Sequence, residues 1–411
     1  MTVNWSYTHW RPGGERARFG EVAFDSSVHC GNGHDFVQLA GGHRTSCGHF
    51  RFRARVHLAP YAWRFLFRID SPGAGREITL EVADFNHTGR TPWHESATAC
   101  SEDGETWLPF DTDRLEIVDW TPTGHPEIDN AYGDAEHIPY GVRYRLRLGA
   151  PTVWFACPTP FTLQHRDALL RHLAALHPEL VETAVVAESA HSARTRYPVK
   201  MARITAPGDL ARRRRVFVIA GEHPAETAGM YACEGWMREV LDHPDWLRRY
   251  VFFFVPVLNV DGVLFGRTYC NVSPGITDGV GVNLSATWDK RPCPEHRGLW
   301  QALTEIRPDL LVSLHNGRHR REMEQFSDSG PATGLISEAL RRHLAFGLVD
   351  AGPTREGRLA RVSIDAGLTD LAFLTETLLL CKLPEAATFA ESYLEVGRQL
   401  ARGYLEGLDA L

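Results

Sequence analysis

The sequence predicts an α/β protein in two parts. Residues 1–160 should form an antiparallel β-sandwich, and residues 161–411 a mixed, mostly parallel sheet with helices on both faces. Three observations support this prediction. Short alternating strands fill the first part, apolar strands separated by amphipathic helices fill the second, and 411 residues suit two domains better than one.

Alternating strands separated by turn signals make up the first part. Residues 50–58 alternate strictly between apolar and polar side chains, as a half-buried strand does. Turn signals rich in glycine, proline and serine lie at 71–75 and 101–104. Several short strands at such spacing are typical of an antiparallel sandwich. The strands that we expect here cover residues 50–58, 63–69, 77–82, 143–148 and 152–156.

Continuously apolar strands alternate with amphipathic helices in the second part. Such strands are buried on both faces, so helices should cover both sides of the sheet. In folds of this kind, ligands bind beyond the carboxyl ends of the strands. We expect strands at 216–220, 251–257, 310–315 and 371–380, and helices at 163–176, 228–241, 298–306, 332–349 and 389–410.

The composition is that of a globular protein, with 43% hydrophobic and 23% charged residues. The net charge of −7 argues against nucleic acid as a partner. No apolar run reaches the roughly 18 residues that a membrane-spanning helix needs. The first ten residues resemble no secretion signal and the eight cysteines form no CxxC pair, so we expect a cytoplasmic protein with reduced thiols. The oligomeric state stays open.

Two histidine segments fall at the ends of apolar strands. His223 and Glu226 form an HxxE motif after one strand, and His315 ends another. Because a catalytic zinc takes three protein ligands and keeps one position open, we expect these three residues to bind one zinc ion. A capped helix start and a buried structural histidine are the alternatives. A second HxxE copy, from His319 to Glu322, lacks a preceding strand, and we interpret it as a solvated loop.

A carboxylate also interrupts the last apolar strand. Glu376 lies among leucines and threonines, and a glutamate in such surroundings must be paired with a cation, protonated or functional. The segment 259–262, Asn-Val-Asp-Gly, follows the central apolar strand and forms a turn signal. A paired structural glutamate is the alternative interpretation of Glu376.

With these residues the chain resembles the M14 zinc carboxypeptidases, most closely their cytosolic branch. The sequence His-Pro-Ala-Glu-Thr from His223 is similar to the His-Pro-Gly-Glu-Thr form of that branch, whose members also carry an N-terminal β-sandwich. The resemblance covers roughly residues 165–411, and about 1–160 for the sandwich. It implies a carboxypeptidase-like fold, Glu376 as the general base and Asn259 in a turn beside the substrate.

The substrate-binding motif departs from the family pattern. In the family, an Asn-Arg pair grips the C-terminal carboxylate of the substrate, and Ser285 and Ala286 occupy those places here. The arginine that stabilises the oxyanion corresponds to Tyr269, with Arg267 two residues away. A packed aromatic is the alternative for Tyr269, and a solvated basic loop for residues 318–321. Candidate replacement cations are Arg267, Arg291, Arg318, Arg320 and Arg321.

The predicted function is that of a zinc-dependent hydrolase of the carboxypeptidase type, acting on a peptide or a small amide. Glu376 would accept a proton from the attacking water, and Arg267 or Tyr269 would stabilise the oxyanion. Two alternatives stay open. One is a zinc amidase or deacylase whose substrate lacks a free C-terminal carboxylate, and the other is a catalytically inactive binding module. Because Ala286 has no donor, we expect weak activity on generic free-acid peptides unless Arg267 or Arg318 replaces it.

Overall fold

The computed structural model describes residues 14–42, 46–54, 64–85, 98–118, 140–191, 195–271, 281–317, 322–378 and 383–411. The chain divides into two compact units. Unit 1 comprises residues 1–160, 262–281 and 387–389, and unit 2 comprises residues 161–261, 282–386 and 390–411. The short segment 262–281 therefore belongs to unit 1 although it lies far along the chain.

Unit 1 contains two sheets, each made of short strands. One has the order β1-β2-β5-β11-β7-β8 and the other the order β3-β4-β6-β10-β9. The strands of the first are β1 Arg16–Phe19, β2 Val22–Asp25, β5 Phe65–Asp70, β11 Thr152–Cys157, β7 Ala99–Ser101 and β8 Leu108–Pro109. Those of the second are β3 His34–Ala40, β4 Ser46–Arg53, β6 Glu77–Phe85, β10 Tyr140–Arg147 and β9 Leu115–Val118, with a 3-10 turn, η2, at Thr112–Arg114.

Aromatic rings from both sheets of unit 1 meet in its core. Phe24 of β2 stacks on Phe36 of β3, with ring centroids 4.9 Å apart, and Phe52 of β4 meets Phe67 of β5 at 4.8 Å. The two sheets therefore pack face to face, as a sandwich does. Pairing is antiparallel except between β4 and β6, which run parallel.

Segment 262–281 is held within unit 1 by hydrogen bonds to buried side chains. The Nη1 atom of Arg64 donates to the Arg267 carbonyl at 2.8 Å, and the Nδ2 atom of Asn32 donates to the Gly266 carbonyl at 3.0 Å. Arg64 is only 3% exposed, so these carbonyl acceptors offset the cost of burying its guanidinium.

Unit 2 is built on one eight-stranded sheet with the order β12-β13-β15-β14-β16-β19-β17-β18. The four central strands run parallel to one another, β13 and β12 are antiparallel on one side, and β17 pairs antiparallel with β19 on the other. The strands are β12 Val181–Ala187, β13 Val199–Ile204, β15 Tyr250–Val255, β14 Arg214–Ala220, β16 Leu310–Gly317, β19 Ala372–Leu378, β17 Glu322–Ser327 and β18 Gly347–Gly352.

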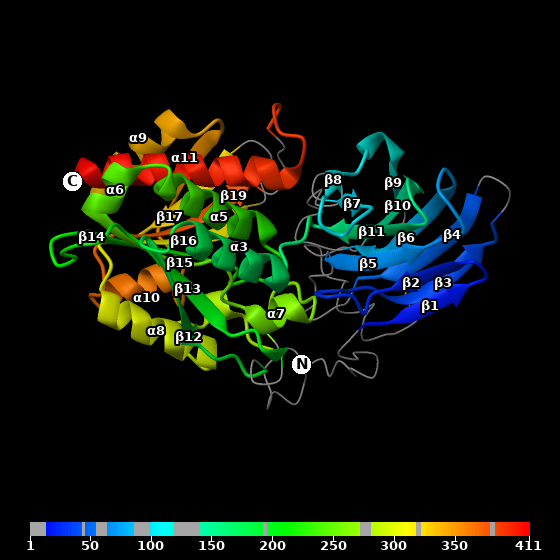
Figure 1. Cartoon of the computed structure of the whole chain (residues 1–411), viewed down its shortest axis with the longest axis horizontal. Helices are drawn as coiled ribbons and strands as arrows, with labels where there is room; N and C mark the ends of the chain where they lie inside the picture. The colour runs from blue at the N-terminus through cyan, green and yellow to red at the C-terminus, as the bar shows by residue number, and fades with distance from the viewer. Residues whose placement is uncertain are drawn as a thin grey trace. The chain divides into compact units, whose positions relative to one another are not determined.

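Helices cover both faces of this sheet. In Figure 1, α5 and α11 lie on one face and α8 and α10 on the other. Strand β15 is buried along its length and β14 is buried from Val216 to Ala220, because both faces are covered. The helices are α3 Leu163–Leu176, α5 Thr227–Leu241, α6 Pro244–Arg249, α7 Val260–Leu264, α8 Pro294–Ile306, α9 Ala332–His343, α10 Leu359–Asp365 and α11 Phe389–Asp409, with a 3-10 turn, η3, at Leu284–Ala286.

The predicted fold class is confirmed: a mixed α/β fold with an N-terminal, mainly antiparallel pair of sheets. Two local predictions were wrong. The helix expected over 332–349 ends at His343, because Leu344 is extended and Gly347–Gly352 pairs as β18 with β17. Glu322, expected in a loop, is the exposed first residue of β17, while His319 lies outside the described residues. Of the strand expected at 50–58, the last four residues also lie outside them.

Four strands of unit 2 escaped the sequence analysis, namely β12, β13, β17 and β18. All four lie at an edge of the sheet or next to one, where polar and partly exposed residues weaken the apolar pattern. Within the described residues, no helix combines the length and the apolar character needed to cross a membrane.

Candidate metal centre

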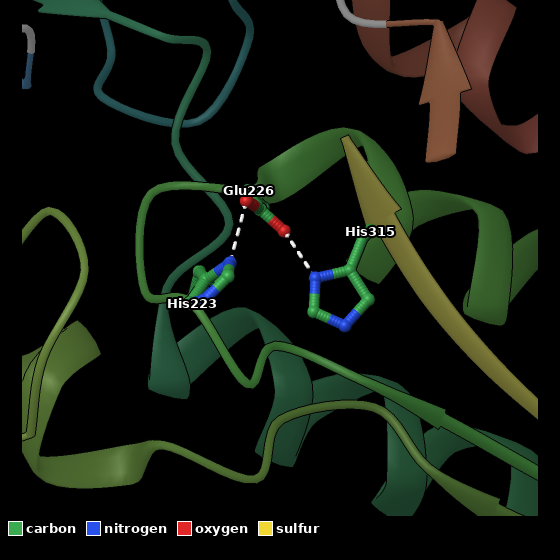
Figure 2. Close-up of side chains that lie close together, drawn as sticks. All are labelled: His223, Glu226 and His315. Carbon is green, nitrogen blue, oxygen red and sulfur yellow. Dashed lines mark hydrogen bonds and ion pairs between the residues drawn. The ribbon is translucent and has the colours of Figure 1, made fainter. Parts of the chain in front are cut away.

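Three buried side chains of unit 2 converge at the carboxyl ends of strands β14 and β16. The ligand atoms of His223, Glu226 and His315 all lie within 4.8 Å of one another, and each residue is at most 4% exposed. Figure 2 shows both imidazoles turned toward the same carboxylate. The Nδ1 atom of His223 lies 2.7 Å from Glu226 Oε1, and the Nδ1 atom of His315 lies 2.8 Å from Oε2.

The local fold brings these side chains together. His223 follows strand β14, and Glu226 is at the position just before the first turn of α5, where the helix dipole favours a carboxylate. Helix α5 approaches β16 closely at Gly229, where an added Cβ atom would lie 2.7 Å from the Leu314 carbonyl oxygen. A larger residue at 229 would push α5 away from β16 and separate Glu226 from His315.

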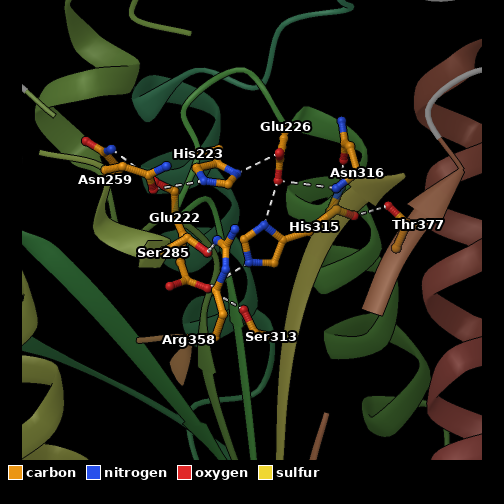
Figure 3. A network of polar contacts seen from close by, with 12 residues as sticks. Glu222, His223, Glu226, Asn259, Ser285, Ser313, His315, Asn316, Arg358 and Thr377 are labelled. Atoms are coloured by element: carbon orange, nitrogen blue, oxygen red, sulfur yellow. Dashed lines mark hydrogen bonds and ion pairs between the residues drawn. The ribbon is translucent and has the colours of Figure 1, made fainter. Parts of the chain in front are cut away.

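Each histidine is oriented by an acceptor on its other ring nitrogen. The Nε2 atom of His315 lies 2.8 Å from Glu222 Oε2, and the Nε2 atom of His223 lies 3.1 Å from Asn283 Oδ1 (Figure 3). Both acceptors hold a hydrogen on Nε2, so each Nδ1 lone pair is left for the shared centre. Partners of this kind fix the tautomer and the orientation of metal-binding histidines.

Glu222 is itself tightly held. Its Oε1 atom accepts from Trp288 Nε1 at 2.6 Å, and its Oε2 atom accepts from Ser313 Oγ at 2.5 Å. Burial by itself would raise the pKa of Glu222, but the hydrogen bonds from His315, Ser313 and Trp288 outweigh burial and lower that pKa to about 2. Glu222 therefore stays ionised and accepts from His315 at any ordinary pH.

The charged groups of the centre shift the pKa values of one another. Burial would raise the pKa of Glu226, yet the charges of His223 and His315 move that pKa well below its usual range. Burial would lower the pKa of His315, yet the carboxylates of Glu226 and Glu222 raise it well above its usual value. One carboxylate thus lies between two imidazoles. A divalent cation would bind these three groups in their deprotonated forms.

Glu376 lies on the strand next to His315. The two residues are partners in the parallel pairing of β16 and β19, so their side chains are on the same face of the sheet. Glu376 is half-buried. Burial, together with the negative charge of Glu226, raises the pKa of Glu376 to about 8, whereas the charges of His315 and Arg358 act in the opposite direction.

Ser285 is buried in η3, and its hydroxyl accepts a hydrogen bond from Arg358 Nη1, as Figure 3 shows. Asn259 donates from Nδ2 to the Glu222 carbonyl at 3.0 Å, so it holds the backbone just before His223. Arg267 and Tyr269 belong to unit 1, where Arg267 is 1% exposed and Tyr269 is half-buried.

The other arginines predicted as replacement cations are Arg291, Arg318, Arg320 and Arg321. Arg318, Arg320 and Arg321 lie outside the described residues. Arg291 is engaged elsewhere, since its guanidinium lies 4.4 Å from the centre of the Trp300 ring and donates to the Trp288 carbonyl. The roles predicted for all these residues stay predictions.

Three residues at the centre escaped the sequence analysis: Glu222, Asn283 and Arg358. Glu222 had a signal that could have found it, because it immediately precedes His223 at the end of an apolar strand. Asn283 lies two residues before Ser285 in the segment already compared with the family pattern. Arg358 carried no signal, since it lies 73 residues from the side chain that it contacts.

Comparison with known proteins gives the same architecture. Residues 167–301 match the family model described as zinc carboxypeptidase, Peptidase_M14. That stretch is less than half of the chain; it includes His223 and Glu226 and ends before His315. No curated protein matches the chain significantly.

Two solved structures are similar over nearly the whole chain. A metallo-carboxypeptidase from Burkholderia cenocepacia has a TM-score of 0.73 at 16% identity, covering 95% of this chain and 99% of its own. A metallo-carboxypeptidase from Pseudomonas aeruginosa, in complex with (2-guanidinoethylmercapto)succinic acid, has a TM-score of 0.69 at 18% identity, covering 94% and 99%. At such identities the likeness shows a shared fold.

Proposed function

We propose that this protein is a zinc-dependent hydrolase of the M14 carboxypeptidase type that cleaves a peptide or peptide-like amide bond. The observation that carries the proposal is the convergence of His223, Glu226 and His315 on one buried point. The match of residues 167–301 to the zinc carboxypeptidase model and the shared fold support the same chemistry. The similarity of the His223 motif to the cytosolic branch supports that branch and a cytoplasmic location.

Zinc fits the donor set of this centre. Two imidazole nitrogens and one carboxylate are its usual ligands in catalytic sites with an open position. His223, Glu226 and His315 would hold the ion, with Asn283 and Glu222 orienting the two rings. When bound, zinc would polarise the scissile carbonyl and lower the pKa of its water to about 7.

Glu376 is the group that we assign to proton transfer. Its carboxylate shares a face with His315 and is half-buried, so it can reach a water beside the ligands. As a carboxylate at this position, Glu376 can accept a proton from the attacking water. The same oxygen would then pass that proton to the leaving nitrogen. Arg267 or Tyr269 remains our candidate donor to the oxyanion.

The test is hydrolysis of matched peptides by the zinc-supplemented full chain. One series ends in a free carboxylate and the other in a C-terminal amide, and mass spectrometry follows release of the last residue. We expect hydrolysis that a zinc chelator abolishes, that added zinc restores and that Glu376→Gln lacks. No zinc-dependent cleavage in either series would contradict the proposed function. Cleavage of the amidated series alone would favour the amidase or deacylase instead.

A further inference from the structure

The first turn of helix α5 follows one candidate ligand of the metal centre, and that ligand does not cap the helix. Glu226 occupies the position just before this turn, and its side chain forms no capping hydrogen bond to the helix backbone. Its two carboxylate oxygens instead face His223 and His315. A helix begins with backbone N–H groups that have no acceptor within the helix. In α5 these groups therefore need an acceptor from elsewhere.

Asn316 of strand β16 supplies such an acceptor. Its Oδ1 atom accepts from the backbone N–H of Gly229 at 2.8 Å, although the two residues are 87 positions apart in the chain. Gly229 is the third residue of α5, and the N–H of the third residue is one that a capping side chain usually bonds. Asn316 thus takes the capping role that Glu226 leaves open while its carboxylate lies between the two histidines.

The backbone of Asn316 also contacts Glu226 directly, as Figure 3 shows. Its N–H donates at 3.3 Å to Glu226 Oε2, the same oxygen that faces His315 Nδ1. Thr377, its partner in the pairing of β16 with β19, donates from Oγ1 to the His315 carbonyl at 2.6 Å. Strand β16 is therefore fixed at the point where it meets α5.

Only the acceptor oxygen of the Asn316 side chain is used in this contact. The residue is 5% exposed, and its Nδ2 atom has no hydrogen-bond partner among the described residues. A side chain of the same shape that keeps an acceptor oxygen should therefore replace it. Aspartate meets this requirement, and the helix dipole favours a carboxylate at this end of α5.

The distance between α5 and β16 has little tolerance. A Cβ atom at Gly229 would lie 2.7 Å from the Leu314 carbonyl oxygen, so the helix is already as near to the strand as glycine permits. The bond from Gly229 to Asn316 opposes movement in the other direction. Glu226 precedes the helix and His315 lies on the strand, so a shift between the two elements changes the separation of two ligands. Metal–ligand distances vary by only about 0.2 Å in a well-formed site.

We propose that Asn316 is a positioning residue of the metal centre: by capping α5 from β16, it sets the separation of Glu226 and His315 and thereby raises the affinity for zinc. This inference rests on the proposed function, because it concerns the same zinc site. Ligands that are held in place before the ion arrives lose less conformational entropy on binding. The side chain of Asn316 acts through Glu226.

The test compares the zinc affinity of Asn316→Ala and Asn316→Asp with that of the wild-type full chain. Competition with a chelator of known affinity measures the dissociation constant. We expect Asn316→Ala to weaken zinc binding by about 10- to 100-fold, the range for removal of a group that orients a metal ligand. Asn316→Asp should stay within about threefold of the wild type, because aspartate caps a helix about as well as asparagine.

Gln399→Ala is the matched control. Gln399 is a buried amide that also accepts one backbone N–H, that of Ala345 at 2.9 Å, but it belongs to α11 and not to the elements that carry the candidate ligands. Thermal unfolding of the zinc-free proteins should show a loss of stability in both alanine variants, whereas zinc affinity should fall only in Asn316→Ala. A side chain that merely stabilised the fold would lower stability and leave zinc affinity unchanged.

Unchanged zinc affinity in Asn316→Ala would overturn the inference, and so would an Asn316→Asp variant that loses as much affinity as Asn316→Ala. If Asn316→Ala does not fold, Asn316→Ser is used instead, because its acceptor is one atom closer to the backbone, and the same two outcomes decide. None of these measurements needs a substrate. A wild-type protein that binds zinc without hydrolysing peptides would therefore contradict the proposed function alone, and one that binds no zinc would contradict both.

Discussion

The two units differ in how they arrange buried polar side chains. In unit 1, two arginines of neighbouring strands form ion pairs with the buried carboxylate of Glu81. Arg51 lies 2.7 Å from it and Arg143 lies 3.1 Å from it. The core of that unit also contains a cluster of phenylalanine rings in mutual contact. The charge of Glu81 is thus neutralised by its immediate neighbours.

Unit 2 pairs some buried carboxylates in the same way, as Glu239 does with Arg398 and Arg402, but other buried polar groups gather at the carboxyl ends of its strands. Glu222, Glu226 and His315 lie at the carboxyl ends of β14 and β16, with two carboxylates meeting the same imidazole. A structural core has no need to bring two acids to one histidine, because each burial costs free energy. The comparison indicates that several charged groups gathered at one point, rather than a single buried ion pair, distinguish the candidate functional site.

Loss of one candidate ligand should give the largest effect. We expect His315→Ala to lose bound zinc and with it all hydrolysis, because two remaining ligands rarely hold the ion. Metal analysis of the purified protein measures this. The control is His165→Ala, since His165 also lies 2.7 Å from a glutamate, Glu234, but belongs to no group of potential metal ligands among the described residues. Unchanged zinc content in His315→Ala would remove His315 from the centre.

Removal of the proposed base should leave the metal and abolish turnover. Glutamine at 376 is nearly isosteric but cannot accept a proton, so we expect kcat to fall by about 10²- to 10⁴-fold with zinc retained. The control is Glu324→Gln, because Glu324 faces Glu376 across the pairing of β17 and β19. An equal loss in both variants would assign the effect to local charge rather than to a base.

The fold class and the convergence of His223, Glu226 and His315 were predictable because their signals are local. The strand that ends before His223, and the strand that ends at His315, are both continuous apolar runs. The residues that contact the side chains of the candidate centre were harder to predict. The contact of Ser285 with Arg358, and that of Glu222 with His315, span 73 and 93 residues, and no local pattern links such positions. Only the chain topology brings them together.

A substitution in the aromatic core of unit 1 tests the other side of the comparison between the two units. Phe67 is fully buried and contacts five rings, those of Phe24, Phe36, Phe52, Phe65 and Phe155. We expect Phe67→Ala to lower the free energy of unfolding of unit 1 by about 3–5 kcal/mol. Thermal and denaturant unfolding measure this, with the exposed Val37→Ala as control. Loss of zinc in Phe67→Ala at a temperature where the protein stays folded would contradict the prediction that only residues of unit 2 bind zinc.

The smallest effect should come from a residue that touches no substrate. Glu222→Gln keeps the shape of the side chain but removes the charge that accepts from His315 Nε2, so His315 should bind zinc less strongly. Loss of such a partner typically lowers metal affinity by about 10- to 100-fold. Competition with a zinc chelator of known affinity measures the change, and Glu81→Gln is the control, because Glu81 is equally buried but pairs only within unit 1. Since zinc can still be supplied in excess, kcat at saturating zinc should fall far less than in Glu376→Gln. If Glu222→Gln instead kept full zinc affinity, charge concentrated around His315 would not serve metal binding, and the contrast between the two units would lose its functional meaning.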